Sequence, residues 1–275
     1  MMKPIKKAAL LHDLCGTGKA ALTNMLPILS VMGIEACPLP TMLLSTHTGG
    51  YGIPAVQKIP AEYIRACADH YKREGITFDV IFIGYLGDIS MVEAIQHFVL
   101  SFPDTKVIMD PIMGDHGRYY SNFSPEYSRA ISALLPAADI LLPNLTECCL
   151  LLDIPFKPDF PASELKGICS SLRDRFDAKD IIVTSVAAGG RKKGIVLCEG
   201  ENFAILDNTY IDCEYHGTGD AFDGVFVGEY LTGRSLIECV RKAHDFVYEC
   251  IRESNKYEYA GREGLLIEKN LHMLV

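Results

Sequence analysis

The chain has 275 residues, of which 49% are hydrophobic, so it is long enough and apolar enough to bury a sizeable core. Its formal charge of −9 argues against a nucleic-acid or an anionic membrane surface as partner, although a nucleotide needs only local donors. No apolar run approaches the roughly 18 residues that cross a bilayer. The ten cysteines form no C-x-x-C pair, and residues 1–9 show no signal peptide. We therefore expect a cytoplasmic protein with reduced, mostly buried cysteines.

Strands and helices alternate along the first two thirds of the chain. Apolar runs predict strands at residues 8–11, 35–44, 79–83, 106–109, 139–142 and 180–183. Helical spacing predicts helices at residues 19–32, 61–74, 89–102, 125–135 and 162–176. Pro38 and Pro40 favour an edge position for the second strand. This alternation is typical of a mostly parallel sheet with helices on both faces.

The pattern changes near residue 190. Residues 194–198 and 202–206 predict an antiparallel meander at one edge of the sheet. The basic segment Arg191–Lys193 before it is interpreted as a solvated hairpin tip, with a phosphate-facing loop as the alternative. Two more helices are predicted to end near residues 231 and 253. Because no linker or repeat interrupts the chain, we expect residues 1–275 to form one domain.

Polar side chains recur directly after the predicted strands. They are Asp13, Tyr85, Asp110, Asn144 with Glu147, and Thr184 with Ser185. Ligands of open α/β sheets bind outside the carboxyl ends of the parallel strands, where such side chains meet. The sequence therefore predicts one binding site that draws on all of these loops.

Two glycine-rich turns invite a phosphate-binding interpretation. The first, Gly16–Lys19, fails as a P-loop, because Asp13 replaces the required glycine and Ala20 the metal-binding hydroxyl residue. The second, Gly217-Thr218-Gly219-Asp220, opens a helix whose unpaired amides and dipole suit a phosphate. Asp220 would repel an anion, so it is better placed as a base beside a phosphoryl group in transit. The alternative is that the turn merely caps the helix, since Thr and Asp are good N-caps.

These residue types match the requirements of phosphoryl transfer, which depends on positioning and on neutralising the phosphate oxygens. The carboxylates of Asp110, Asp115 and Glu147 are hard oxygen ligands that suit Mg²⁺, directly or through its waters. The neutral side chains that suit phosphate oxygens are Asn144, Thr184 and Ser185. Together they indicate a small-molecule kinase.

Five motifs, in family order and over nearly the whole chain, resemble the ribokinase-like superfamily and, within it, the pyridoxal/pyridoxamine kinases. They are Leu44-Ser45-Thr46-His47-Thr48-Gly49, Gly84-Tyr85-Leu86-Gly87, Asp110-Pro111-Ile112-Met113-Gly114-Asp115, Pro143-Asn144-Leu145-Thr146-Glu147 and Gly217-Thr218-Gly219-Asp220. The resemblance implies a three-layer α/β/α fold with a central mostly parallel sheet, a small antiparallel edge meander and no large lid. It also implies ATP-dependent phosphorylation of the 5′-hydroxymethyl group of a vitamin B6 vitamer, with Mg²⁺, often a monovalent cation such as K⁺, and a homodimer.

The same resemblance implies a role for each group. Asp220 would be the base, and the amides of Gly217–Gly219 would form the anion hole. The residues expected to serve Mg²⁺–ATP are Asp110, Asn144, Glu147, Thr184, Ser185, Thr218 and Gly219. Those expected around the alcohol substrate are Asp13, His47, Thr48, Tyr85 and Asp220. Residues 115–120 would form a mobile loop over the site.

Asp13 departs from the family pattern, because the best-known pyridoxal kinases carry a serine there. An aspartate could pair with a protonated ring nitrogen or with an exocyclic amine such as that of pyridoxamine, or it could indicate another heteroaromatic alcohol. A hydroxymethylpyrimidine (phosphate) kinase is the nearest rival, although that family tends to carry a cysteine in place of Asp220. A non-catalytic vitamin- or nucleotide-binding protein on the same fold is a further alternative. We expect His12 and His116 to be hydrogen-bonded or solvent-facing rather than catalytic, and His216 to be structural.

Overall fold

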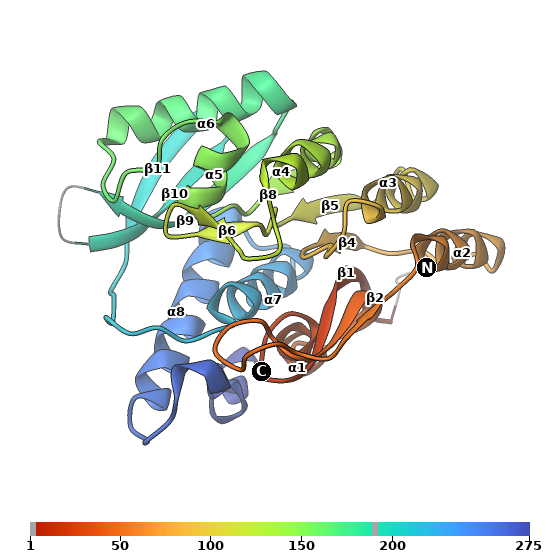
Figure 1. The fold of residues 1–275 in the computed structure, drawn as a ribbon, viewed down its shortest axis with the longest axis horizontal. Helices are drawn as coiled ribbons and strands as arrows, with labels where there is room; N and C mark the ends of the chain where they lie inside the picture. The colour runs from red at the N-terminus through yellow and green to blue at the C-terminus, as the bar shows by residue number, and fades with distance from the viewer. Residues whose placement is uncertain (1–3, 189–191) are drawn as a thin grey trace.

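The computed structural model describes residues 4–188 and 192–275, which form three layers with a nine-stranded sheet between two layers of helices (Figure 1). In sheet order the strands are β11 (Asn202–Asp207), β10 (Lys192–Glu199), β9 (Asp180–Ala188), β8 (Ile140–Leu141), β5 (Lys106–Met109), β4 (Val80–Ile83), β1 (Lys6–Thr17), β2 (Ile34–Thr46) and β3 (Val56–Lys58). The strands from β9 to β2 pair in parallel, and the outer strands β11, β10 and β3 pair antiparallel. The predicted fold class, with its antiparallel edge meander, is confirmed.

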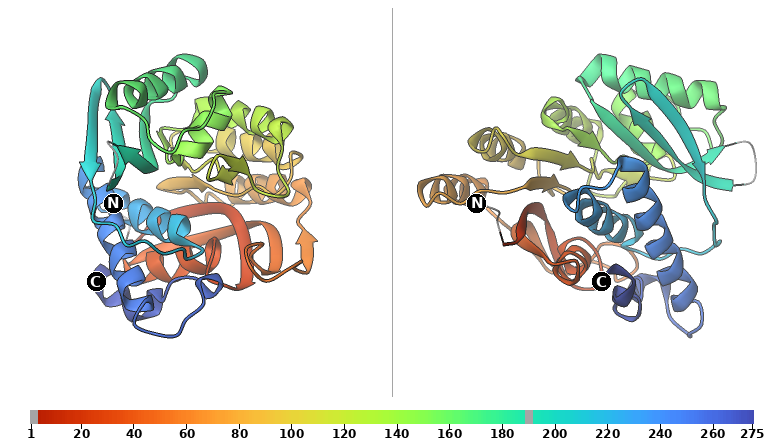
Figure 2. Two further views of the ribbon diagram at one scale, coloured as in Figure 1. Left: turned by 60° about the vertical axis from the view of Figure 1, so that its left-hand side comes forward. Right: turned by 180° about the vertical axis from the view of Figure 1, so that it is seen from behind.

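Helices cover both faces of the sheet, as the two views of Figure 2 show. One face carries α2 (Ala61–Arg73), α3 (Met91–Ser101), α4 (Pro125–Ile131), α5 (Leu145–Leu152) and α6 (Ala162–Phe176). The other carries α1 (Leu22–Val31), α7 (Thr218–Leu231) and α8 (Leu236–Ser254). Short 3₁₀ helices lie at Ser132–Ala137, Gly261–Glu263, Ile267–Lys269 and Leu271–Leu274.

Strand β4 explains why its sequence reads as an uninterrupted apolar run. All four of its side chains are fully buried. Because successive side chains point to opposite faces of a strand, Val80 and Phe82 pack in the α1–α7–α8 core while Ile81 and Ile83 pack in the other core. A strand that is covered on both faces needs apolar residues at every position.

Several predicted boundaries differ from the structure around strands β1 and β2. Strand β1 continues six residues beyond the predicted end, because Leu14, Cys15 and Thr17 still pair with β2 after a register shift at residues 12–14. Helix α1 therefore begins only at Leu22. The short, exposed strand β3 was not predicted, and it pairs only with residues 42–44 of β2. Both prolines of β2 precede that stretch, so they lie where no outer strand needs an N–H donor.

Two other segments bear on the predictions. Residues 115–120, expected as a loop, belong largely to a two-stranded hairpin of β6 (Gly114–Asp115) and β7 (Arg118–Tyr119). Strands β9 and β10 pair antiparallel, but Arg191 lies outside the described residues, so the interpretation of the Arg191–Lys193 segment stays a prediction. In the described ranges, no helix is both long and apolar enough to cross a membrane. None of the ten cysteines is in a disulfide, and most are buried, as predicted.

Candidate active site

Every side chain that the sequence predicted for the site lines one cavity of about 400 Å³ at the carboxyl ends of the parallel strands. The cavity also draws on residues from outside the predicted set, notably His12, Ala21, Tyr120, Tyr215 and His216. Lys19 does not line it, since its ammonium group pairs with Glu268 at 2.8 Å, which agrees with the rejection of a P-loop.

The N-terminus of α7 forms one wall of the cavity and has no side-chain cap. Its N-cap is Gly217, with φ 76°, and neither Thr218 nor Asp220 caps the helix. The first amide that bonds back is that of Ala221, which donates to the Gly217 carbonyl at 3.0 Å, so residues 218–220 present amides without an intrahelical partner. The interpretation of this turn as a mere side-chain cap is therefore wrong.

The two glycines of this turn are required for different reasons. A Cβ on Gly217 would lie 2.0 Å from the Lys19 carbonyl oxygen, and the positive φ already disfavours other residues. The side-chain amide of Asn24 bonds both carbonyls that meet here, those of Lys19 at 2.7 Å and Gly217 at 3.0 Å. A Cβ on Gly219 would meet no atom within 4 Å, so the space beside this glycine, which lines the cavity, is open. That space is a cradle for a phosphate group.

Asp220 lies directly beside these amides. Its carboxylate is 3.1 Å from His12 Nε2 and also accepts a hydrogen bond from the backbone N–H of Ala21. Burial tends to raise its pKa, but the His12 and Ala21 contacts outweigh burial and lower the pKa below the usual value. Ala21 holds a left-handed φ of 56° with ψ −134°, a strained conformation for a residue with a Cβ, and such strain is concentrated at functional sites. Asp220 is thus an ionised acceptor at neutral pH.

His12 is a site residue that the sequence did not single out. Its side chain is 1% exposed and lies between two carboxylates, with Nδ1 2.8 Å from Asp13 and Nε2 3.1 Å from Asp220. Of the two expected alternatives, His12 is therefore the hydrogen-bonded one and not the solvent-facing one. The other oxygen of Asp13 accepts a hydrogen bond from the Cys15 thiol at 3.2 Å. In the sequence, the signal for His12 as a site residue was its position directly before Asp13 and directly after the predicted strand at residues 8–11.

Asp110 lines the same cavity, and behind it lies Asp223, a buried residue outside the cavity lining that the sequence did not single out. Asp110 and Asp223 are almost fully buried, and each has a carboxylate oxygen without a hydrogen-bond partner among the described residues. Burial raises the pKa of both far above the usual value, and repulsion between neighbouring carboxylates raises it further. Asp223 follows Asp220 by three residues, so helical spacing on α7 was the signal for it.

These acids suit a divalent cation. Oxygen donors of this kind are the preferred ligands of Mg²⁺, and a cation would relieve both the repulsion and the unpartnered oxygen of Asp110. Asp115, with a half-exposed side chain that also lines the cavity, accepts a hydrogen bond from the His116 amide at 2.7 Å. In the described part of the chain, no three such side chains form a ready-made metal site, so any ion would also rely on ligand oxygens or water.

Asn144 and Glu147 form the capping box of α5. The Asn144 side chain accepts from the Glu147 amide at 2.9 Å and donates to the Gly114 carbonyl at 2.9 Å. The Glu147 carboxylate accepts from the amides of Asn144 and Met113 at 2.8 and 3.0 Å. Because both oxygens already accept a backbone hydrogen bond, Glu147 can reach a metal ion through water more readily than directly. The pair also anchors the strand that carries Asp115.

The remaining predicted side chains come from the loops after β2 and β4 and from strand β9, which continues past its predicted end and contains Thr184 and Ser185. Both nitrogens of His47 are used, since Nε2 donates to the Arg262 carbonyl at 2.7 Å and Nδ1 accepts from the Gly49 amide at 3.0 Å. His47 therefore offers the cavity its ring surface, which packs on His216 with centroids 4.5 Å apart. The Tyr85 hydroxyl accepts a hydrogen bond from Asn122 at 2.5 Å. The other predicted residues, Thr48, Thr184 and Ser185, line the wall.

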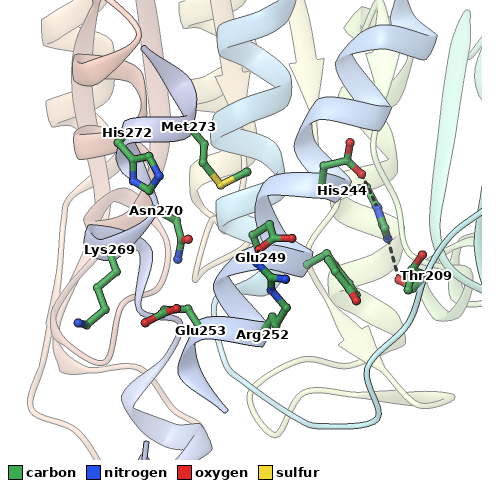
Figure 3. Close-up of a pocket in the computed structure, with 11 residues that line it drawn as sticks. Thr209, His244, Glu249, Arg252, Glu253, Lys269, Asn270, His272 and Met273 are labelled. Atoms are coloured by element: carbon green, nitrogen blue, oxygen red, sulfur yellow. Dashed lines mark hydrogen bonds and ion pairs between the residues drawn. The ribbon is translucent and has the colours of Figure 1, made fainter. Parts of the chain in front are cut away.

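A larger cavity of about 840 Å³ lies on the outer side of α8 (Figure 3). It contains none of the predicted site residues. Charges of both signs line it, and His244 Nε2 lies 3.2 Å from the Thr209 carbonyl. It offers no arrangement comparable to the free amides beside Asp220, so the candidate active site is the smaller cavity.

Free helix N-terminal amides beside an ionised carboxylate, at the carboxyl edge of a parallel sheet, are the parts of a small-molecule kinase with a ribokinase-like fold. Residues 25–263 match the phosphomethylpyrimidine kinase family, and the chain belongs to that family. The protein is therefore a kinase of the group that comprises pyridoxal kinases and hydroxymethylpyrimidine phosphate kinases, and it transfers a phosphoryl group to an alcohol.

Relatives of both activities match most of the chain. A pyridoxine/pyridoxal/pyridoxamine kinase of Bordetella bronchiseptica is 25% identical, over 87% of this chain and 86% of its own. A hydroxymethylpyrimidine/phosphomethylpyrimidine kinase of Haemophilus influenzae is 23% identical, over 91% of this chain and 92% of its own. A Bacteroides thetaiotaomicron protein that is described as a phosphomethylpyrimidine kinase and was solved with pyridoxal is 37% identical, with a TM-score of 0.91 and coverage of 98% and 96%. Pyridoxal kinase of Lactobacillus plantarum is 26% identical, with a TM-score of 0.87 and the same coverage.

Proposed function

We propose that the protein uses ATP to phosphorylate the 5′-hydroxymethyl group of a vitamin B6 vitamer, with Asp220 as the general base. The observation that carries this proposal is the ionised carboxylate of Asp220 beside the free amides of the same helix turn. Support also comes from the Bordetella relative and from the Bacteroides structure that contains pyridoxal.

The reaction needs three contributions from this chain. Asp220 takes the proton from the hydroxymethyl group as its oxygen attacks the terminal phosphorus of ATP, and ADP leaves. The amides of Thr218 and Gly219 hold the negative oxygens of the phosphoryl group, and removal of one such donor typically lowers turnover by about 10²–10³-fold. Thr184 and Ser185, which line the cavity, contact the nucleotide, while Thr48, Tyr85 and the His47 ring enclose the pyridine.

Mg²⁺ would be held by Asp110 and Asp115, with Glu147 acting through water. When bound, it neutralises charge on the phosphate oxygens. The unpartnered oxygen of Asp110 is the observation that favours this assignment. A monovalent cation, a homodimer and a cytoplasmic location stay predictions from the sequence.

A hydroxymethylpyrimidine (phosphate) kinase is the second candidate. Asp13 favours it as much as it favours pyridoxamine, because a buried carboxylate at the edge of the cavity can accept a hydrogen bond from an exocyclic amine. The aspartate at position 220 favours the vitamin B6 alternative.

A comparison of substrates tests the proposal. ADP release would be measured with ATP and Mg²⁺ in the presence of pyridoxal, pyridoxamine, pyridoxine or hydroxymethylpyrimidine. We expect the highest kcat/KM with a B6 vitamer; a clear preference for hydroxymethylpyrimidine would establish the second candidate instead. Binding without turnover of any of the four would show a non-catalytic protein. Asp220→Asn is expected to lower turnover by ~10²-fold or more with ATP affinity retained.

A further inference from the structure

The His12 ring is held by elements that are far apart in the sequence. It belongs to β1, lies over Phe82 of β4 with ring centroids 6.0 Å apart, and contacts Asp220 of α7. A Cβ on Gly84 would lie 2.4 Å from His12 Cδ2 and 2.6 Å from Nε2, so the ring packs directly on the backbone after β4. This contact explains the first glycine of the Gly84–Gly87 motif. The ring has no space in which to turn.

Both ring nitrogens face carboxylates. Nδ1 lies 2.8 Å from an Asp13 oxygen, and Nε2 lies 3.1 Å from Asp220. The backbone N–H of Asp13 also points at Nδ1 at 2.9 Å, so Nδ1 either accepts from that N–H or, when protonated, donates to the Asp13 carboxylate. A neutral imidazole has one N–H, so it can satisfy only one carboxylate; the doubly protonated ring satisfies both. Burial lowers the pKa of His12, but the hydrogen bonds to Asp13 and Asp220 outweigh burial and raise it to about 10. Asp110, at the end of β5, is a third acid within electrostatic reach of the ring.

We propose that His12 is a positioning residue, which fixes the carboxylate of Asp220 toward the reacting hydroxyl and links it to Asp13, the residue that contacts the polar group of the substrate ring. This inference rests on the proposed function. The three side chains form a row of alternating charge, Asp13, His12 and Asp220, in the lining of the cavity. A cationic or hydrogen-donating group of the substrate at Asp13 would extend that row.

A positioning role for His12 predicts different effects on kcat and on KM for ATP, which a purely structural histidine would not show. Loss of the His12 contact to Asp220 should lower kcat, because the base is then free to rotate, whereas KM for ATP should stay unchanged because the amides of α7 are untouched. His12→Asn keeps a donor near Nδ1 but is too short to reach Asp220, and His12→Gln is long enough to reach it. We expect kcat to fall by at least ~10-fold in the first variant and to recover in part in the second.

His97→Gln is the matched control. His97 also pairs with an aspartate, with Nε2 2.9 Å from Asp69, but on the exposed surface of α3 away from the cavity. Its kcat and KM should equal those of the native protein. A loss of kcat in this variant equal to that of His12→Asn would overturn the inference, since the effect would then not come from the site.

A double-mutant cycle with Asp220→Asn gives the decisive measurement. If His12 acts through Asp220, His12→Asn should change the residual kcat of the Asp220→Asn protein by less than ~3-fold, because residues that act as one unit are not additive. The same fold-loss in both backgrounds, or full kcat in both His12 variants, would refute the inference. Native turnover in Asp220→Asn itself would instead refute the assignment of the base.

Gly84→Ala perturbs the ring without altering its chemistry. The added methyl group must displace His12, so kcat should fall while KM for ATP is retained. This variant keeps the inference testable even if the His12 variants do not fold. Native kcat in a folded Gly84→Ala protein would contradict the inference.

Discussion

Gly219→Ala should separate the stability of α7 from its ability to bind phosphate. Gly219 lies in the first turn of the helix, and its Cβ would meet no protein atom within 4 Å. Replacing a helical glycine with alanine stabilises a helix by up to about 1 kcal/mol, so the folded state should be slightly more stable. The methyl group, however, occupies open space on the cavity side of the turn, where we expect it to hinder a phosphate group from approaching the amides.

The expected loss of affinity follows from the hydrogen bonds that the methyl group blocks. A hydrogen bond to a charged group contributes roughly 1.5–3 kcal/mol, which corresponds to ATP binding about 10- to 100-fold more weakly. Calorimetric titration with ATP and Mg²⁺ measures this loss, and urea unfolding without ligand measures the stability.

Gly167→Ala is the control. Gly167 also lies inside a helix, α6, with no atom near its added Cβ, but it is remote from the cavity. It should show the same gain in stability with native ATP affinity. Native ATP affinity in Gly219→Ala would refute the assignment of these amides to phosphate.

Three further predictions concern Gly217, Asp13 and His12. Gly217→Ala should destabilise the protein by about 1–3 kcal/mol more than Gly33→Ala, which has the same positive φ but open space around its Cβ; equal urea midpoints would contradict this. Asp13→Ser should change the ratio of kcat/KM for pyridoxamine to that for pyridoxal, and an unchanged ratio would exclude Asp13 from selecting the substrate. The pKa of His12 is raised from 6.5 to about 10, so its stabilising effect is complete below pH 6.5 and is lost as the pH rises through 10. As an upper bound this effect is on the order of 5 kcal/mol. The free energy of unfolding should therefore fall more steeply between pH 6.5 and 10 in the native protein than in His12→Gln. Parallel pH profiles of the two proteins would refute the charged pair.

The sequence predicted that the polar residues after the strands form one site, and this prediction depends on the geometry of parallel sheets. Every parallel strand ends at the same edge, so polar groups that follow successive strands must meet there. Asp110 and Asn144 could therefore be assigned to one cavity without knowledge of any distance.

Two local spacings in the sequence carry information about the site beyond the strand ends. Asn144 and Glu147 have the spacing of a capping box, and the structure shows that their side chains do bond the start of α5. Asp223 likewise lies one helical turn beyond Asp220. The very short strand β3 offered no such signal, because all three of its residues are exposed and nothing in their pattern demands a partner.

The sequence by itself determined the order of the layers, the family motifs and the turn that opens α7, because strand and helix periods and helix-terminal residues are local properties. Only the tertiary structure decided which charges meet. His12 and Asp220 are 208 residues apart, and their 3.1 Å contact depends on β1 and α7 packing in the same core. The charge state of His12 and of Asp110 also depends on burial, which pattern alone does not give. The electrostatics of the site therefore had to come from the fold.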